Sequence, residues 1–252
     1  LWLVEQLNKI DNLEEITLTT NGSQLTKYAK QLALHGVKRI NVSLDSLDEK
    51  KFSEITRTGK LSQVLSGIQS AKDAGFESIK LNSVILKNRN DDEILDLLKY
   101  AIKNELDISF IEEMPLGKIE EHDRQLAFCS SDEVRQMMES RYTLESSDKK
   151  TNGPSRYCKV SGSNSHVGFI SPHSNNFCSE CNRIRITVEG KLLLCLGNEN
   201  SIDLRALIRE ESAHSLQLQT AIKEALVNKP EKHHFDLSAE PEIVRFMNTT
   251  GG

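Results

Sequence analysis

The sequence predicts an α/β protein, with a parallel sheet in its N-terminal half and a metal-binding segment in its C-terminal half. β-branched runs alternate with amphipathic helical patterns over residues 1–112. This order requires helices that cross over between parallel strands, and it therefore predicts the sheet. A group of three closely spaced cysteines after residue 177 predicts the metal-binding segment. The alternation leaves open whether the sheet is open or closed into a barrel.

The elements of the N-terminal half follow from local patterns. Apolar residues from Leu61 to Ala71 recur every three or four positions, which predicts a helix that Gly75 ends. Asn90 and Glu93 have the spacing of a capping box, so a second helix is expected from Ile94. The expected strands are 16–20, 39–45, 78–86 and 107–111.

The alternation stops after the segment 112–117, and we place the domain boundary near residue 113: residues 1–112 form one expected domain and 113–252 the other. A short helix is expected from Ser131 to Met138, capped by Ser131 or Asp132. Residues 183–188 and 191–196 read as a hairpin whose turn is Glu189-Gly190. Residues 202–226 read as one helix.

Three of the expected strands have one polar face. A parallel strand that is buried on both faces reads as a continuous apolar run instead. We therefore expect the sheet to face a wet or ligand-filled cavity; the alternative is an open sheet with partly exposed strands. The polar positions are Thr17 and Thr19 on the first strand, Asn41, Ser43 and Asp45 on the second, and Lys80 and Asn82 on the third.

Single polar residues near the strand ends allow more than one interpretation. Lys80 stands on a central strand, where a buried ammonium needs an anionic partner, which favours a ligand contact. Asp45 alone is typical of a helix cap, and Asn21-Gly22 of a turn. Glu112-Glu113 is either a general acid/base pair or a structural pair that caps or forms salt bridges.

The three cysteines have the spacing of a metal site. Cys178 and Cys181 form a C-x2-C pair, and the hairpin returns Cys195 to it. Three thiolates fit an iron–sulfur cluster with one open iron, or a zinc site that His166 or His173 completes. Beside them, Arg183 and Arg185 share one strand face, which suits a phosphate group but is also typical of a solvated face.

Composition limits the class of protein. The 252 residues carry a net charge of −5 and no long apolar run, so we expect neither a nucleic-acid nor a membrane partner. Five cysteines, three of them crowded into 178–195, favour a reducing, cytoplasmic setting over a disulfide scaffold. The sequence starts without Met inside a helical pattern, so we expect a fragment of a longer protein.

With these residues together, the sequence resembles the GTP 3′,8-cyclases of molybdenum-cofactor biosynthesis, a family of radical S-adenosylmethionine enzymes. The resemblance covers essentially the whole chain, and its most specific part is the CNRIR segment with its three cysteines. The matching stretches are LTTNG (18–22), INVSLDSLD (40–48), Lys80-Leu81-Asn82, FIEEMPLG (110–117), residues 168–197, Arg245-Phe246-Met247 and Gly251-Gly252.

The resemblance implies a partial TIM-type barrel, (βα)6, that here lacks its first two strands, followed by a C-terminal iron–sulfur domain. It implies that this chain holds one 4Fe–4S cluster and contacts both GTP and S-adenosylmethionine. The implied residues are Cys178, Cys181 and Cys195 for the cluster, Thr19, Lys80, Arg183, Ile184 and Arg185 for GTP, and Ser43 and Met114 for S-adenosylmethionine.

The resemblance also implies chemistry that the sequence carries only in part. The family converts GTP to 3′,8-cyclo-7,8-dihydro-GTP with a radical made from S-adenosylmethionine at a second 4Fe–4S cluster. That cluster's C-x3-C-x2-C motif is missing from this sequence, so we expect the chain alone not to generate the radical, and we assign no catalytic residue.

Further partners follow from the same resemblance. They are a reductant protein, the downstream cyclic pyranopterin monophosphate synthase and, as an open option, a second copy of the chain. Two other readings remain: a zinc- or nucleotide-binding module without catalysis, and another radical S-adenosylmethionine enzyme with an auxiliary cluster. The second of these tends to carry more C-terminal cysteines than the three found here.

Overall fold

The computed structural model describes residues 1–119, 121–210, 215–233, 235–237, 243 and 245. It divides into two compact units, each with its own apolar core. The first unit comprises Leu1–Glu113 and Ala127–Ser174, and the second comprises Met114–Leu126 and Asn175–Gly252. None of the described helices is long and apolar enough to cross a membrane.

The first unit is built on a seven-stranded sheet in the order β1-β2-β3-β4-β7-β6-β5. The first five strands in this order run parallel, and β6 and β5 are antiparallel to their neighbours. This confirms the expected α/β class and the mainly parallel sheet. The strands are β1 (Ile16–Thr20), β2 (Val37–Ser43), β3 (Ser78–Ile85), β4 (Asp107–Glu112), β5 (Leu144–Ser146), β6 (Arg156–Val160) and β7 (His166–Ile170).

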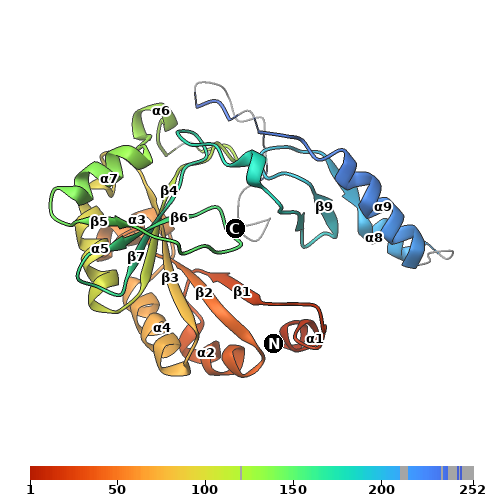
Figure 1. The fold of residues 1–252 in the computed structure, drawn as a ribbon, viewed down its shortest axis with the longest axis horizontal. Helices are drawn as coiled ribbons and strands as arrows, with labels where there is room; N and C mark the ends of the chain where they lie inside the picture. The colour runs from red at the N-terminus through yellow and green to blue at the C-terminus, as the bar shows by residue number, and fades with distance from the viewer. Residues whose placement is uncertain (120, 211–214, 234, 238–242, 244, 246–252) are drawn as a thin grey trace. The chain divides into compact units, whose positions relative to one another are not determined.

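Helices cover the apolar face of this sheet (Figure 1). Ile40, Val42, Leu81 and Ile108 are fully buried beneath them, because every second residue of a strand points to the same face. The helices of the first unit are α1 (Trp2–Leu7), α2 (Leu25–Leu34), α3 (Glu49–Thr56), α4 (Leu61–Ala74), α5 (Ile94–Lys103) after the 3-10 turn η1 (Asp91–Glu93), and α7 (Ser131–Glu139). The short helix α6 (Arg124–Ala127) begins in the second unit and ends at the first residue of the segment that returns to the first.

The predicted helix ends are correct in one case and wrong in two. Gly75 ends α4 in the left-handed conformation, as expected. Helix α7 is capped by Ser130, with Glu133 completing a capping box, and not by Ser131 or Asp132. Asn90 makes no side-chain cap bond. Instead its side chain binds backbone groups of Asp45, Val84 and Leu86, because it lies where β2 and β3 end together.

The expected boundary at residue 113 separates the units only in part. Residues 127–174, which the sequence assigned to the C-terminal domain, pack with the first unit. The reason is strand pairing: β7 adds to the edge of β4, and β6 and β5 extend the sheet from there.

The second unit contains a three-stranded antiparallel sheet in the order β10-β9-β8. Strands β8 and β9 form the expected hairpin, with Gly190 in the left-handed region at φ 83°. The single helix expected over 202–226 is wrong, because its first residues pair with β9 as a strand. The elements are η2 (Cys178–Glu180), β8 (Arg185–Ile186), β9 (Lys191–Leu193), β10 (Ser201–Asp203), α8 (Leu204–Arg209) and α9 (Ser215–Val227).

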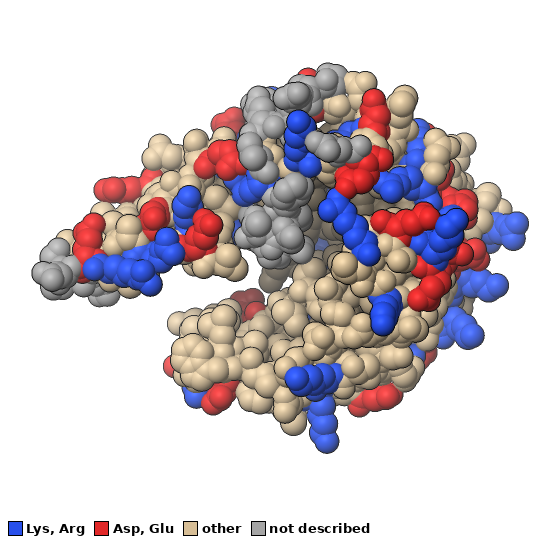
Figure 2. Space-filling model, turned by 180° about the vertical axis from the view of Figure 1, so that it is seen from behind, with Lys and Arg blue, Asp and Glu red and all other residues tan. Residues whose placement is uncertain are grey.

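Charged side chains are mixed on the visible face of the molecule. Figure 2 shows Lys and Arg interspersed with Asp and Glu. This distribution agrees with a net charge of −5 and gives that face no single large basic patch.

Candidate functional site

One row of polar side chains crosses the first four strands of the sheet. Thr19 is paired with Asn41, Asn41 with Lys80, and Lys80 with Asp107. The Asn41 amide donates to Thr19 Oγ1 at 3.3 Å. Thr19 and Lys80, which the resemblance names as GTP contacts, therefore stand in the same row, separated by one strand.

A second row lies nearer the carboxyl ends of the strands. Ser43 is paired with Asn82, and Asn82 with Ser109. Two residues along a strand correspond to about 7 Å, so Ser43 stands that far from the row of Asn41 and Lys80. The residue expected to contact S-adenosylmethionine thus shares a sheet face with two expected GTP contacts.

Asp45 follows this second row. It is not the helix cap that the sequence suggested: Oδ1 accepts a hydrogen bond from Val84 N at 2.8 Å, and Asp48 caps α3. Burial raises the pKa of Asp45 to about 6, against the lowering effect of the Val84 hydrogen bond.

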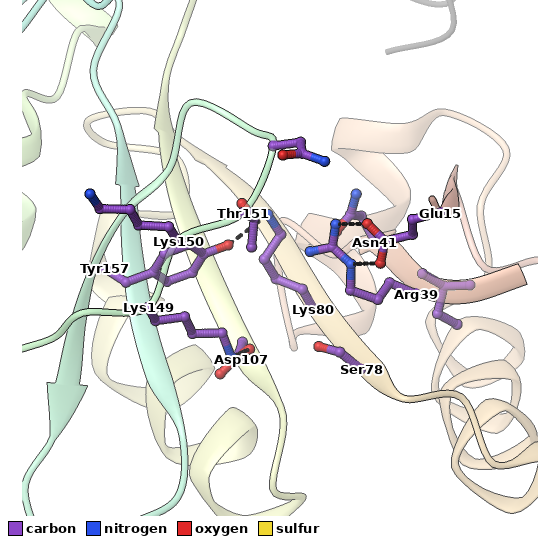
Figure 3. A pocket seen from close by; sticks show the side chains of 12 residues that line it. Glu15, Arg39, Asn41, Ser78, Lys80, Asp107, Lys149, Lys150, Thr151 and Tyr157 are labelled. Atoms are coloured by element: carbon purple, nitrogen blue, oxygen red, sulfur yellow. Dashed lines mark hydrogen bonds and ion pairs between the residues drawn. The ribbon is translucent and has the colours of Figure 1, made fainter. Parts of the chain in front are cut away.

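A cavity of about 370 Å³ opens on the polar face at the amino ends of the strands (Figure 3). It confirms the expected cavity, although the strands facing it are only half-buried in an open sheet. Its charged lining residues are Glu15, Arg39, Lys80, Asp107, Lys149 and Lys150.

In this cavity Lys80 is paired with the phenol of Tyr157. Lys80 Nζ donates to Tyr157 OH at 3.2 Å, and no carboxylate among the described residues lies within ion-pair distance of Lys80. The expected anionic partner is thus not supplied by the described part of the chain. Burial raises the pKa of Tyr157, but the charge and hydrogen bond of Lys80, together with hydrogen bonds from Thr151 and Ser155, outweigh burial and hold the pKa below its usual value.

Glu112 is fully engaged in structural hydrogen bonds. It is 1% exposed and accepts from Ser131 N, His173 N and both the backbone and the side chain of Ser174. Burial raises its pKa, but these hydrogen bonds outweigh burial and hold the pKa below its ordinary value. The carboxylate therefore has a structural role, which decides against the acid/base interpretation of Glu112.

The histidines proposed for a zinc site both lie in the first unit, whereas the three cysteines lie in the second. His166 Nδ1 is 3.3 Å from Asp107. His173 Nε2 lies 2.9 Å from Glu113 O, and its ring packs edge-on against Phe128. His173 therefore has its own contacts, whereas Nδ1 of His166 is buried without a hydrogen-bond partner among the described residues.

The cysteine pair occupies a tight turn in the second unit. Cys181 N donates to Cys178 O at 3.0 Å across η2. Cys178 Sγ accepts a hydrogen bond from His233 N at 3.4 Å. The ring of His233 has other contacts: it stacks on Phe235 with centroids 3.8 Å apart.

Lys229 joins the two cysteine-bearing segments. Its ammonium donates to Arg183 O at 2.9 Å and to Leu194 O at 2.5 Å, and lies 3.9 Å from Cys181 Sγ. Cys195 is the neighbour of Leu194 in the sequence. Burial raises the pKa of Cys181, but a hydrogen bond from the Arg183 backbone and the charges of Arg183 and Lys229 outweigh it and lower the pKa.

The three cysteines can be compared with the two metal groups that the sequence analysis left open, a zinc ion and an iron–sulfur cluster. Among the described residues, no three Cys, His, Asp or Glu side chains are close enough to share one metal ion. A structural zinc ion needs four such ligands around one centre. A 4Fe–4S cluster places its cysteines on separate irons, and three free thiols on two segments that one lysine joins fit this requirement better.

Arg183 and Arg185 lie on one face of the strand that leaves this turn, both half-buried. Arg183 lies over the Phe177 ring at 5.5 Å, and its Nε is buried without a hydrogen-bond partner. Burial lowers the pKa of Arg185, and the charges of Arg183 and Arg245 lower it further. Crowded guanidinium groups of this kind are stabilised by an anion.

The remaining expected residues lie nearby in the sequence or outside the described parts. Ile184 is 42% exposed between the two arginines. Met114 is half-buried, two residues after β4 ends, and belongs to the second unit. Phe246, Met247, Gly251 and Gly252 lie outside the described residues.

Sequence reasoning did not identify Lys229, His233 or Tyr157, because no spacing pattern distinguishes them.

Comparison with known proteins gives the family. A family model for the radical SAM superfamily matches residues 3–101, and one for Molybdenum Cofactor Synthesis C matches residues 106–235. A GTP 3′,8-cyclase of Ectopseudomonas mendocina is 54% identical over 252 residues, which are 100% of this chain and 76% of that protein. The chain belongs to the GTP 3′,8-cyclase family. It is therefore related to enzymes of molybdenum-cofactor biosynthesis.

Other relatives agree with this assignment. GTP 3′,8-cyclase 2 of Pseudomonas aeruginosa is 54% identical over 250 residues, covering 99% of this chain and 76% of that protein. Among solved structures, SuiB of Streptococcus suis superimposes with a TM-score of 0.50 at 14% identity, over 92% of this chain and 59% of that chain. That likeness supports the α/β fold alone.

Proposed function

We propose that the protein acts in the first step of molybdenum-cofactor biosynthesis, the cyclisation of GTP to 3′,8-cyclo-7,8-dihydro-GTP. The observation that carries this proposal is the arrangement of the sheet's polar face. Thr19 and Lys80 share one row, and Ser43 stands in the next row, about 7 Å nearer the carboxyl ends. A substrate on the first row and S-adenosylmethionine on the second would be neighbours.

Each residue then has a defined task. The Lys80 ammonium pairs with a phosphate of GTP, and Thr19 Oγ1 hydrogen-bonds the same substrate. Arg183 and Arg185 contribute charge, and the Ile184 backbone lies between them. Ser43 and Met114 hold S-adenosylmethionine. The proposed partners are a reductant protein, cyclic pyranopterin monophosphate synthase and a second copy of the chain.

Cys178, Cys181 and Cys195 are the proposed cluster ligands. When bound, a 4Fe–4S cluster there supplies an open iron for the guanine ring. The sequence contains no C-x3-C-x2-C segment, so we assign the radical-generating step to no residue of this chain.

Metal analysis tests the cluster. After anaerobic reconstitution we expect about four iron and four sulfide per chain, with absorbance near 400 nm. The Cys181→Ser variant is expected to lose most of this iron, whereas Cys129→Ser, which removes a buried thiol of the first unit, keeps it. One zinc per chain without iron contradicts the proposal.

GTP titration tests the arginines. Replacing Arg183 or Arg185 with Ala is expected to weaken GTP binding by about 1–3 kcal/mol, the range for a lost charge-assisted hydrogen bond. Isothermal titration calorimetry measures this loss. Arg209→Ala, on the exposed end of α8, serves as the control and is expected to bind normally. If Arg183→Ala and Arg185→Ala bind GTP as tightly as the wild type and the Arg209→Ala control, Arg183 and Arg185 do not belong to the GTP site.

A further inference from the structure

Two lysines flank one tyrosine ring in the cavity of the first unit. Lys80 Nζ lies 5.8 Å and Lys149 Nζ 5.7 Å from the centroid of the Tyr157 ring. The residues come from different places in the sequence: Lys80 from β3, Tyr157 from β6, and Lys149 from the connection between β5 and β6. Figure 3 shows the tyrosine hydroxyl pointing to Lys80 inside the cavity, with the Lys149 side chain nearby.

The charges of this cavity do not balance. Its lining contains Arg39, Lys80, Lys149 and Lys150 against the two carboxylates of Glu15 and Asp107. Arg39 is neutralised by Glu15, which contacts it with both oxygens. Asp107 therefore remains as the one carboxylate of the lining to balance Lys80, Lys149 and Lys150, and it pairs with Lys149.

The ion pair of Lys149 can be exchanged. Its Nζ lies 2.5 Å from Asp107 Oδ2, while Asp107 Oδ1 accepts from His166 N at 2.9 Å. Asp107 thus keeps a second hydrogen bond if Lys149 turns to another anion. The Tyr157 hydroxyl lies in the same positive field, which agrees with the lowered pKa of this phenol.

We propose that Lys149 and Tyr157 act with Lys80 as the binding site for the polyphosphate tail of a nucleoside triphosphate. Lys149 exchanges Asp107 for a phosphate oxygen, and the Tyr157 hydroxyl donates to another. This inference rests on the proposed function for the identity of the nucleotide. It adds two residues that the family resemblance does not name.

The position of the cavity gives the bound nucleotide a direction. Arg39 and Ser78, which also line it, are paired with each other one row nearer the amino ends than Lys80. Ser43 lies one row nearer the carboxyl ends. A tail held by Lys149 and Tyr157 therefore leaves the sugar on the side of Ser43, where S-adenosylmethionine is proposed to bind.

Calorimetric titration with GTP, GMP and inorganic tripolyphosphate tests the inference on the reconstituted protein. Lys149→Met and Tyr157→Phe are expected to weaken binding of GTP and of tripolyphosphate about tenfold, consistent with one lost hydrogen bond to a charged group, and to affect GMP much less. Lys159→Met, an exposed lysine on the same strand as Tyr157, is expected to bind all three ligands normally.

A gain of affinity separates this role from a fold defect. Asp107→Asn keeps an acceptor for His166 N but releases Lys149, so tripolyphosphate is expected to bind several-fold more tightly. Equal tripolyphosphate binding by the wild type and all variants overturns the inference, and so does equal weakening of GTP and GMP. If tripolyphosphate binds as expected but GTP binds no better than tripolyphosphate, the polyphosphate site stands and the proposed function fails.

Discussion

Replacing Glu112 with Gln is expected to lower the free energy of unfolding at neutral pH by roughly 1–3 kcal/mol, the range for leaving buried hydrogen-bond donors without an acceptor. The carboxylate accepts from Ser131 N at 2.9 Å, His173 N at 3.0 Å and Ser174 N at 3.1 Å, and from the Ser174 hydroxyl. These bonds tie the end of β4 to the start of α7 and to the segment after β7. A glutamine amide would direct N–H groups at some of these donors.

The loss is expected to depend on pH. Because the folded-state pKa of Glu112 is below its unfolded value, its stabilisation is fully present above the unfolded pKa and is lost as the pH falls through the folded pKa. Urea unfolding at pH 7.5 and at about pH 3.5, below the usual glutamate pKa, should show a smaller difference between wild type and Glu112→Gln at the lower pH.

An exposed glutamate provides the control. Glu145 lies on β5 with its side chain in solvent, so Glu145→Gln is expected to change the unfolding free energy by less than about 0.5 kcal/mol. A pH-independent loss for Glu112→Gln contradicts the argument, because it would mean that the charge of the carboxylate is not what stabilises the fold.

The features that the sequence predicted are those with a local cause. Alternation in 39–45 identifies a strand and its polar face, since the period of two is a property of a single strand. Gly75 and Gly190 mark turns because both adopt positive φ, which glycine accepts without strain. The tight turn that joins Cys178 and Cys181 is likewise predicted by their spacing, whereas their role as metal ligands stays a prediction.

The features that the sequence missed depend on the tertiary fold. Asn90 and Glu93 matched a capping box, yet Glu93 accepts from Ser46 Oγ at 2.6 Å and Leu47 N at 2.9 Å, because the end of β2 lies beside it. The return of β7 to the edge of β4 could not be read from residues 144–174, since strand order is set by pairing between distant segments.

The candidate site also contains residues that the sequence indicated and residues that it did not. The place of Lys80 on a polar strand face marked it as a candidate ligand contact. Tyr157 and Lys149, which lie near it in the cavity, come from a segment about 70 residues later. A tyrosine and a lysine in an irregular polar stretch are ordinary residues. Only the packing of β6 into the sheet gives them a common cavity.

Replacing Lys229 tests whether its contacts hold the cysteine-bearing segments of the second unit together. Replacing it with Met, which has similar length and no charge, leaves the carbonyls of Arg183 and Leu194 without their donor. It also removes the cation 3.9 Å from Cys181 Sγ. We expect the two cysteine-bearing segments to separate, so that the Lys229→Met protein takes up much less iron on anaerobic reconstitution.

The charge of Lys229 can be examined apart from its hydrogen bonds. Removing a cation beside an iron–sulfur cluster disfavours the more negative, reduced state, so any cluster that Lys229→Met retains should have a lower reduction potential. Lys229→Arg keeps the charge and is expected to keep most of the iron. Lys223→Met, on the exposed face of α9, is the control. Iron and sulfide analysis with a redox titration measures both effects, and wild-type values for Lys229→Met would show that the contacts of this lysine do not support the cluster.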